Sequence, residues 1–285
     1  MPVSFHLCQP GRGASCGACC GLYNFRDHSR EALTQRLAEQ TARMRQVPLE
    51  KEAWRAAAQR TIESRTEAPL FPAVRVCPLL GFIDEAQRRV GCLGHPKATG
   101  GVDLRDCGVY RASICETFTC PSFGWLEDAQ ARLIEAACQD WYLYGLVITD
   151  VEFVRGCLRL IEREVGGPAR PEHMLARPLA LDAVRRLFAL KETAAGRSLH
   201  APIFGRFAPD TEGEPVSRTL NYARLGVRAA PEDDVVLCLG YDPDDAESIT
   251  AARERVRLHV RAVARALMDP VLSPAPRRAG KAVPT

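Results

Sequence analysis

Apolar residues recur at helical spacing in several segments of the chain. Leu33, Leu37 and Met44 follow Ser29, a residue type that caps helix N-termini, so we expect a helix from Ser29 to about Pro48. Similar stripes and end signals predict further helices at 49–65, from Glu127 through Tyr144, at 151–165, at 179–191, and after Pro243-Asp244-Asp245.

Other segments lack helical spacing. The continuous apolar run Val235-Val236-Leu237-Cys238-Leu239 is typical of a buried strand. Residues 1–27 are rich in glycine and cysteine and are expected to form an irregular loop. Prolines and glycines interrupt residues 68–124, and a stretch this long without regular structure is uncommon inside a compact domain. We therefore expect cross-links, such as metal–thiolate bonds, to hold it.

These elements predict a mainly α fold. In it, an irregular cysteine-rich metal-binding layer packs on helices, and a little β structure lies in the C-terminal part. Gly166-Gly167-Pro168 and Pro171 are typical of a hinge or domain boundary. The predicted organisation is a cysteine-cluster metal-binding domain (1–165), a helical region with a short strand (172–270) and a disordered tail (271–285).

Size and charge exclude some classes of function. The 285 residues carry a net charge of +3, which gives no general attraction for nucleic acid or an anionic membrane. No apolar run approaches the roughly 18 residues that span a bilayer, and the N-terminus has no pattern of a secretory signal. We expect a cytoplasmic protein without a membrane or nucleic-acid partner, and the sequence identifies no protein partner.

The placement of the cysteines is the strongest chemical signal. The chain has 12 of them, and cytosolic thiols stay reduced, so disulfides are not expected. Cys138, Cys157 and Cys238 are scattered on apolar faces and are expected in the core. The others, concentrated in the first half, are candidate metal ligands: Cys8, Cys16, Cys19, Cys20, Cys77, Cys92, Cys107, Cys115 and Cys120.

The spacing of these residues suits metal chemistry. Cys16 and Cys19 form a Cys-x-x-Cys knuckle, which lets two sulfurs converge on one metal. The adjacent Cys19 and Cys20 more easily serve two metals, or two corners of a cluster. Cys92-x-x-His95 offers a mixed thiolate–imidazole pair, which makes His95 an alternative ligand.

The chain resembles the YkgJ-like cysteine-cluster proteins, a family described as having a zinc- or iron-chelating domain. Its hallmark is Cys-x-x-Cys-x-x-Cys-Cys, followed by an isolated Cys before a short apolar run, a Cys near an aromatic residue or His, and an Arg-x-x-x-Cys segment. The matching residues are Cys16, Cys19 and Cys20, Cys77 in Val76-Cys77-Pro78-Leu79-Leu80, Cys92 before His95, and Cys115 after Arg111.

This resemblance covers about residues 8–124. The family's first hallmark cysteine corresponds to Gly13 here, and Cys8 lies further upstream as its replacement. Cys107 and Cys120 are additional to the family pattern. The resemblance implies metal binding, and because its relatives, the flagellin lysine methylases, are enzymes, it also raises a catalytic alternative.

The sequence leaves two alternatives open for the metal and two for the function. Sets rich in thiolates suit both zinc and iron–sulfur clusters. The single Cys-x-x-Cys knuckle and the Cys77-Pro78 and Cys120-Pro121 pairs favour an iron–sulfur cluster slightly. The first functional hypothesis is a protein that binds zinc or iron for storage, delivery, sensing or structure. The second is an iron–sulfur enzyme related to the flagellin lysine methylases, with methyltransferase-like or redox activity.

Overall fold

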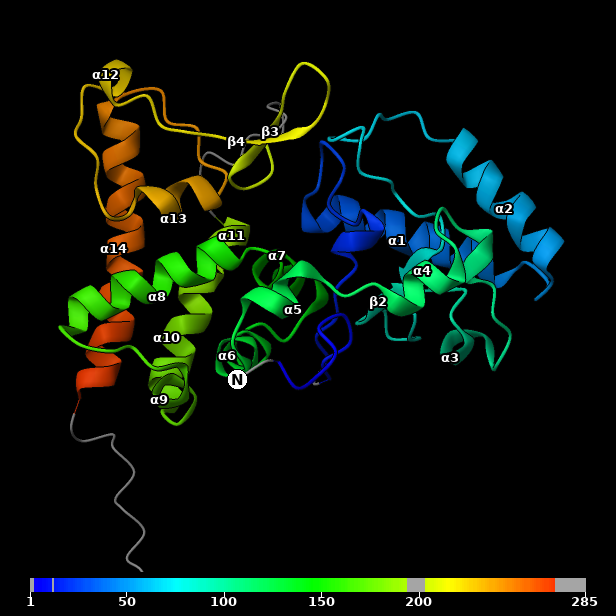
Figure 1. Cartoon of the computed structure of the whole chain (residues 1–285), viewed down its shortest axis with the longest axis horizontal. Coiled ribbons are helices and arrows are strands. Elements are labelled where there is room, and N and C mark those ends of the chain that lie inside the picture. Colours follow the sequence, from blue (N-terminus) through cyan, green and yellow to red (C-terminus); the bar gives the residue numbers. More distant parts are fainter. Residues whose placement is uncertain (1–2, 12, 194–202, 270–285) are drawn as a thin grey trace, which may run out of the picture.

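The computed structural model describes residues 3–11, 13–193 and 203–269, and these are mainly helical (Figure 1). The predicted tail 271–285 lies outside the described residues. The helices before residue 150 are η1 (Ala18–Cys20), α1 (Arg30–Arg45), α2 (Lys51–Glu63), α3 (Pro96–Thr99), η2 (Arg105–Cys107), α4 (Ala112–Thr117), α5 (Pro121–Trp125), α6 (Asp128–Ala137) and α7 (Trp141–Ile148). Those after it are α8 (Val151–Val165), α9 (Pro171–Leu175), α10 (Pro178–Phe188), α11 (Leu190–Thr193), α12 (Tyr222–Leu225), α13 (Asp233–Cys238) and α14 (Ala246–Met268).

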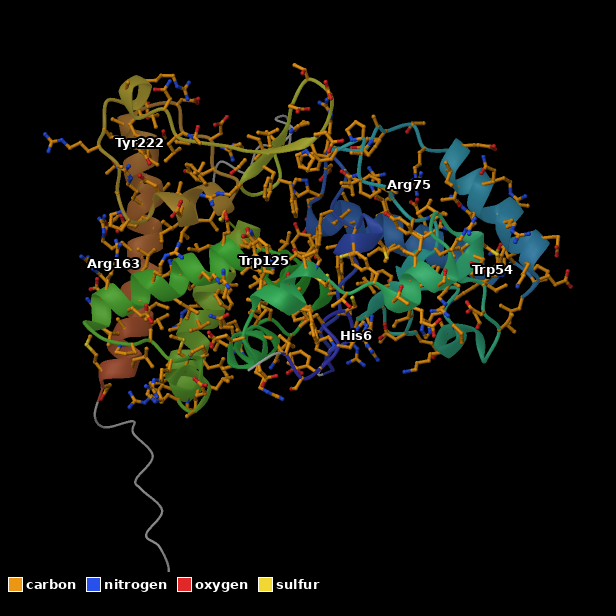
Figure 2. All side chains as sticks on the ribbon, in the orientation of Figure 1. His6, Trp54, Arg75, Trp125, Arg163 and Tyr222 are labelled. Carbon is orange, nitrogen blue, oxygen red and sulfur yellow. The ribbon has the colours of Figure 1, made fainter. Side chains whose placement is uncertain are left out.

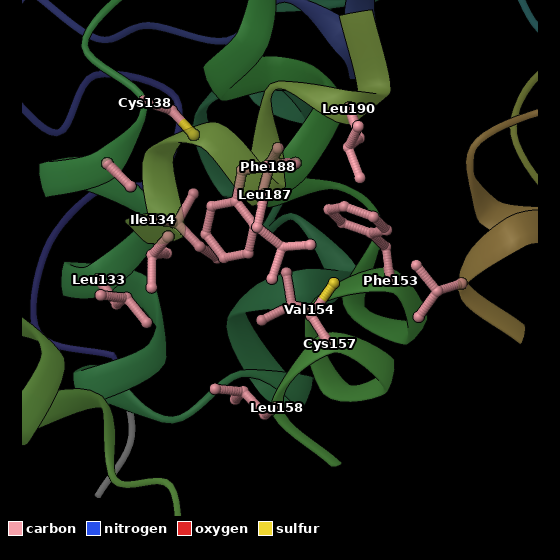
Figure 3. Packing of buried hydrophobic residues seen from close by; sticks show 14 of the residues in the cluster. Leu133, Ile134, Cys138, Phe153, Val154, Cys157, Leu158, Leu187, Phe188 and Leu190 are labelled. Atoms are coloured by element: carbon pink, nitrogen blue, oxygen red, sulfur yellow. The ribbon is translucent and has the colours of Figure 1, made fainter. Parts of the chain in front are cut away.

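Helices α8, α10, α13 and α14 form the main packing unit. The carboxylate of Asp150 caps α8 by accepting a hydrogen bond from the amide of Phe153 (2.9 Å), and Gly166 ends it with a left-handed φ of 75°. Helix α14 packs on both α8 and α10, and α8 also packs on α13. Their apolar faces join α6 in one core, so the packing runs across the predicted boundary at 166–171. Figure 3 shows part of this core: Leu133, Ile134, Cys138, Phe153, Val154, Cys157, Leu158, Leu187, Phe188 and Leu190.

The strand predicted at 235–239 is wrong, because this run lies in helix α13 and its C-terminal end. Val235 and Val236 are fully buried there, so the helix is apolar on most sides and shows no amphipathic period. The C-terminal β structure instead comes from β3 (Phe207–Pro209) and β4 (Pro215–Ser217), which pair antiparallel. A little β structure in the C-terminal part is therefore confirmed, from a different segment.

The single helix predicted from Glu127 to Tyr144 is two helices, α6 and α7. The chain leaves the helical conformation at Cys138, and Asp140 begins α7. Its carboxylate accepts hydrogen bonds from the amides of Tyr142 and Leu143, both at 2.9 Å. The sequence suggested one continuous helix because α7 is buried along its whole length. Its apolar residues therefore continue the apolar stripe of α6, although the helix axis changes between the two. The helices predicted at 29–48, 49–65, 151–165, 179–191 and after Asp245 are confirmed, with shifts of a few residues.

The stretch 68–124 contains short elements, as predicted, but it also has apolar packing that the sequence pattern did not reveal. Strands β1 (Leu80–Phe82) and β2 (Val90–Cys92) pair antiparallel, and β1 packs on α1. Buried Leu79, Leu93 and Leu104 pack with Met44 of α1 and Trp54 of α2. The stretch therefore rests on its own hydrophobic cluster as well as on any cross-links.

Buried hydroxyl groups fasten the N-terminal segment to the middle of the molecule. The hydroxyl of Tyr144 donates to the carbonyl of Leu7 (2.8 Å), and that of Tyr23 donates to the carbonyl of Tyr142 (2.9 Å). In Figure 1 the dark blue segment accordingly runs beside α6 and α7. Among the described helices, none has the length and apolar character needed to span a membrane.

Candidate metal centre

All twelve cysteines lie in the described part of the chain, and all are free thiols. Eight of the nine candidate ligands fall into two neighbouring groups, in which the thiols interact electrostatically with one another, and Cys20 also interacts with Cys8 of the other group. We call Cys8, Cys16, Cys19 and Cys120 the first thiol group, and Cys20, Cys77, Cys92 and Cys115 the second thiol group.

The first thiol group lines one small cavity between the N-terminal loop and α7. Its four cysteines share this cavity with Leu7 and Ile148, and Cys20 reaches it from the second group. The amide of Cys16 donates to the carbonyl of Cys8 (3.0 Å), and the sulfur of Cys16 accepts from the amide of Ala18 (3.4 Å). Figure 2 shows His6 and Trp125, which belong to the flanking segments, in the middle of the molecule.

Three thiols of the first group, Cys8, Cys16 and Cys19, are held neutral by their surroundings, and Cys120 is the exception. Burial raises the pKa of Cys8 to about 11, and the nearby Cys120 adds to this effect. Burial likewise raises the pKa of Cys16, with Cys8 as a further cause. Interaction between the thiols of Cys19 and Cys120 lowers the pKa of Cys120 to about 6 and raises that of Cys19. Four thiolates in this space therefore require a cation in place of the protons.

The second thiol group joins the N-terminal loop to strand β2 and helix α4. The amide of Cys77 donates to the carbonyl of Cys20 (2.9 Å), and β2 places Cys92 opposite Leu80 of β1. At Gly108 a Cβ would lie 3.0 Å from the sulfur of Cys77, so the backbone passes close to this thiol.

Burial and mutual repulsion also raise the pKa values of the second group. Burial is the largest cause for Cys20, followed by Cys77 and Cys92. The pKa of Cys92 is raised to about 12 by burial, followed by Cys77. Backbone amides oppose these shifts, from Leu79 and Val109 toward Cys77 and from Gly94 toward Cys92. Two guanidinium groups also lower the pKa values of these thiols. Arg65 acts on Cys77, and Arg105 acts on Cys92 and Cys115.

The turn at η1 explains why adjacent cysteines belong to different groups. In a 3₁₀ helix, which has three residues per turn, successive side chains point about 120° apart. Cys19 and Cys20 of η1 therefore diverge, the first toward Cys120 and the second toward Cys77. Gly21 ends η1 with a φ of 85°, and a Cβ there would lie 2.6 Å from the carbonyl oxygen of Arg75. Only glycine lets the 75–77 segment approach this closely.

Two sequence candidates lie apart from both groups. The sulfur of Cys107 donates to the carbonyl of Lys51 (3.5 Å) and packs in the hydrophobic cluster with Met44 and Trp54. Nδ1 of His95 accepts from the amide of Lys97 (3.1 Å) and so caps α3. Cys138, Cys157 and Cys238 are buried in the main core, as predicted.

As the described side chains stand, no three His, Cys, Asp or Glu residues are arranged to hold one metal ion together. A tetrahedral zinc site, with Zn–S bonds of about 2.3 Å, brings its sulfurs within about 4 Å of one another. Binding of a single ion would therefore require the thiols of a group to draw closer. The chemistry of these ligands still fits a metal site, because soft thiolates are the preferred ligands of zinc and of iron–sulfur clusters.

Comparison with known proteins finds no family model, no curated protein and no solved structure that matches the chain. The resemblance to the YkgJ-like proteins therefore rests on cysteine spacing alone. The roles of Arg65 and Arg105 beside the thiols were not predicted, because they depend on contacts between segments distant in sequence. The adjacency of Cys19 and Cys20 was the one signal in the sequence that pointed to two groups.

Proposed function

We propose that this chain binds metal through two adjacent sets of four thiolates. The observation that carries the proposal is that eight free thiols gather around the turn at Cys19 and Cys20. Cys8, Cys16, Cys19, Cys20 and Cys120 line one cavity, and the segment of Cys77 is hydrogen-bonded to Cys20 on its other side. Four thiolates are the complete ligand set of a structural zinc site and of a [2Fe–2S] or [4Fe–4S] cluster.

Residues around the thiols would support bound metal by compensating its negative ligands. Backbone amides of Leu79, Val109 and Gly94 point toward sulfurs of the second group, and Arg65 and Arg105 add positive charge. Such outer contacts orient ligands and tune the metal. Bound metal would cross-link the segments that carry the cysteines. If the group is an iron–sulfur cluster, it would also allow electron transfer.

Between the two metals we favour iron–sulfur over zinc. The chain offers one Cys-x-x-Cys knuckle, and Pro78 and Pro121 follow ligands of each group. A second candidate function is an iron–sulfur enzyme with methyltransferase-like or redox activity, related to the flagellin lysine methylases. It is favoured by a cavity that reaches Cys77 of the second thiol group.

The test is to purify the protein without oxygen and to measure zinc, iron and acid-labile sulfide. We expect bound metal, and for the iron–sulfur case a brown protein that bleaches on reduction. Colourless protein with stoichiometric zinc would decide for zinc. Protein that contains neither metal, and in which all eight thiols react freely with a thiol reagent, would refute metal binding.

A further inference from the structure

A cavity of about 200 Å³ lies beside the second thiol group. It is bounded by α1, by the residues that follow α2, and by the loop that leads to Cys77; Arg75, labelled in Figure 2, marks the course of this loop. Apolar side chains, including Phe25, Leu37 and Val76, form much of its wall. Three arginines also line it, and they differ in how their charges are compensated.

Within the described part of the chain, only one of these arginines has a carboxylate partner. Arg36 pairs with Glu67 and lies 4.5 Å over the ring of Phe25. Arg43 donates to the hydroxyl of Thr61 (3.4 Å), which is a neutral group. Arg65 is half-buried, and no described carboxylate forms an ion pair with it. Burial lowers the pKa of Arg65, and although Cys77 opposes this, Arg36 adds to it.

The remaining acids of the cavity are already engaged. Glu67 accepts from the amide of Arg26 (3.0 Å) as well as from Arg36. Glu39 accepts from the side-chain amide of Gln35 (2.8 Å). Glu39 and Glu67 line the cavity, but neither forms an ion pair with Arg43 or Arg65. A partly desolvated guanidinium gains from an anionic partner.

We propose that this cavity binds a small organic carboxylate with an apolar body, whose carboxylate pairs with Arg65. The apolar wall suits the body, and the planar guanidinium suits a carboxylate through two parallel hydrogen bonds. Inorganic phosphate is disfavoured, because it has no apolar body to bury against the apolar wall of the cavity. The site lies next to the second thiol group but does not depend on metal, so it goes beyond the proposed function.

Benzoate and its neutral isostere benzamide provide a matched pair of probes. We expect titrations of the full chain, monitored by NMR or calorimetry, to show that benzoate binds at least about tenfold more tightly than benzamide. A charge-assisted hydrogen bond to the carboxylate predicts this difference. Arg65→Gln should weaken benzoate binding by at least about tenfold, and Arg43→Gln by less. Arg60→Gln, at an exposed position near the end of α2, should leave it unchanged.

Three results would each overturn the proposal. Benzoate and benzamide could bind equally tightly, Arg65→Gln and Arg60→Gln could weaken benzoate binding by the same factor, or inorganic phosphate could bind more tightly than benzoate. Metal content measured on the same samples separates it from the metal hypothesis. Metal-free wild-type protein that binds benzoate through Arg65 would refute the proposed function and support this site. Metal-loaded protein that does not bind benzoate would support the proposed function and refute this carboxylate site.

Discussion

The amide of Cys77 donates a 2.9 Å hydrogen bond to the carbonyl of Cys20, and this contact joins two segments far apart in sequence. Next to it, the side chain of Asn24 accepts from the amide of Phe71 (2.7 Å) and donates to the carbonyl of Val74 (2.7 Å). The 70–77 loop is thus fixed on the N-terminal loop where the second thiol group assembles. Metal bound there would strengthen a junction that hydrogen bonds already define.

Cys20→Ser is expected to loosen the stretch 68–124 more than Cys19→Ser does. Cys20 shares its thiol group with Cys77, Cys92 and Cys115 of this stretch. Each residue released gains roughly 1–2 kcal/mol of backbone entropy, and a structural thiolate site supplies about 10–16 kcal/mol in small zinc peptides. Limited proteolysis of metal-loaded protein, read by mass spectrometry, measures the effect.

Helices α10 and α14 should stay protected in both variants, because they pack in the main core. Cys107→Ser is the control within the stretch, since its thiol belongs to neither group. If Cys20→Ser lost metal and still resisted cleavage at 68–124 as the wild type does, the hydrophobic cluster around Leu79 and Leu104 would hold this stretch without metal.

Gly145→Ala is expected to destabilise the protein, although alanine normally favours a helix. A Cβ at Gly145 would lie 2.1 Å from the hydroxyl oxygen of Tyr23, which donates to the carbonyl of Tyr142. Relief of this clash should cost about 1–3 kcal/mol in the free energy of unfolding, measured by denaturant titration.

The matched control is Gly124→Ala in α5, where a Cβ meets nothing within 4 Å. This change should be neutral or stabilising by up to about 1 kcal/mol. Adding Tyr23→Phe to Gly145→Ala should recover part of the loss, since the closest atom is removed. A Gly145→Ala variant as stable as the wild type would show that Tyr23 does not hold α7 in this way.

Much of the helical fold was predictable because amphipathic helices carry their own signal. Helix α8 ends at Gly166 as its cap residue predicts, and Asp245 caps α14. The errors fall where burial removes the signal, at α13 and at the break between α6 and α7. A run buried on all sides, such as Val235-Val236, fits a strand and a helix equally well.

The candidate ligands were predictable as a set but not as two groups. Spacing identifies cysteines that are clustered in sequence, and so it included Cys107 with the rest. The structure places Cys107 against Lys51 of α2, a contact between segments that no local motif encodes. Cys120 was additional to the family pattern, yet it lies with Cys19 in the wall of one small cavity.

Arg253→Met is expected to cost about 3–5 kcal/mol in the free energy of unfolding. Nε and Nη2 of Arg253 donate to the two oxygens of Asp233 (2.7 and 2.9 Å), and both side chains are at least nine-tenths buried. Removal of the guanidinium leaves a buried carboxylate uncompensated. Urea titration measures the loss.

Arg261→Met on the same helix is the control, because Arg261 pairs with Glu164 near the surface (3.4 Å). Exposed pairs contribute about 0–1 kcal/mol. Similar losses in the two variants would mean that burial of the Arg253–Asp233 pair does not set its importance.

Acid is expected to weaken the attachment of the N-terminal segment to α6. Asp128 accepts from the amide and hydroxyl of Ser4 (2.9 and 2.6 Å) and from Arg132, and these contacts hold its pKa to about 2. The unfolded chain takes up a proton near pH 4, whereas the folded chain resists it. The stabilisation is therefore complete above about pH 4 and is lost as the pH falls to about 2.

The free energy of unfolding measured between pH 5 and pH 2 tests this dependence. Its slope should be smaller in Asp128→Asn, because an amide does not titrate, and the variant should be less stable than the wild type at pH 5. An identical slope in the two proteins would show that Asp128 does not contribute to the acid response.

Metal content in two neighbouring single variants tests the central claim most directly. Wild type, Cys19→Ser, Cys20→Ser, the double variant that carries both changes, and Cys107→Ser would be purified without oxygen and analysed for zinc, iron and sulfide per chain. Two groups of four thiolates predict that Cys19→Ser and Cys20→Ser each lose about half of the metal, that the double variant loses all of it, and that Cys107→Ser keeps all of it. Complete loss in either single variant would contradict two separate groups, and metal retained in the double variant would contradict thiolate binding at this centre.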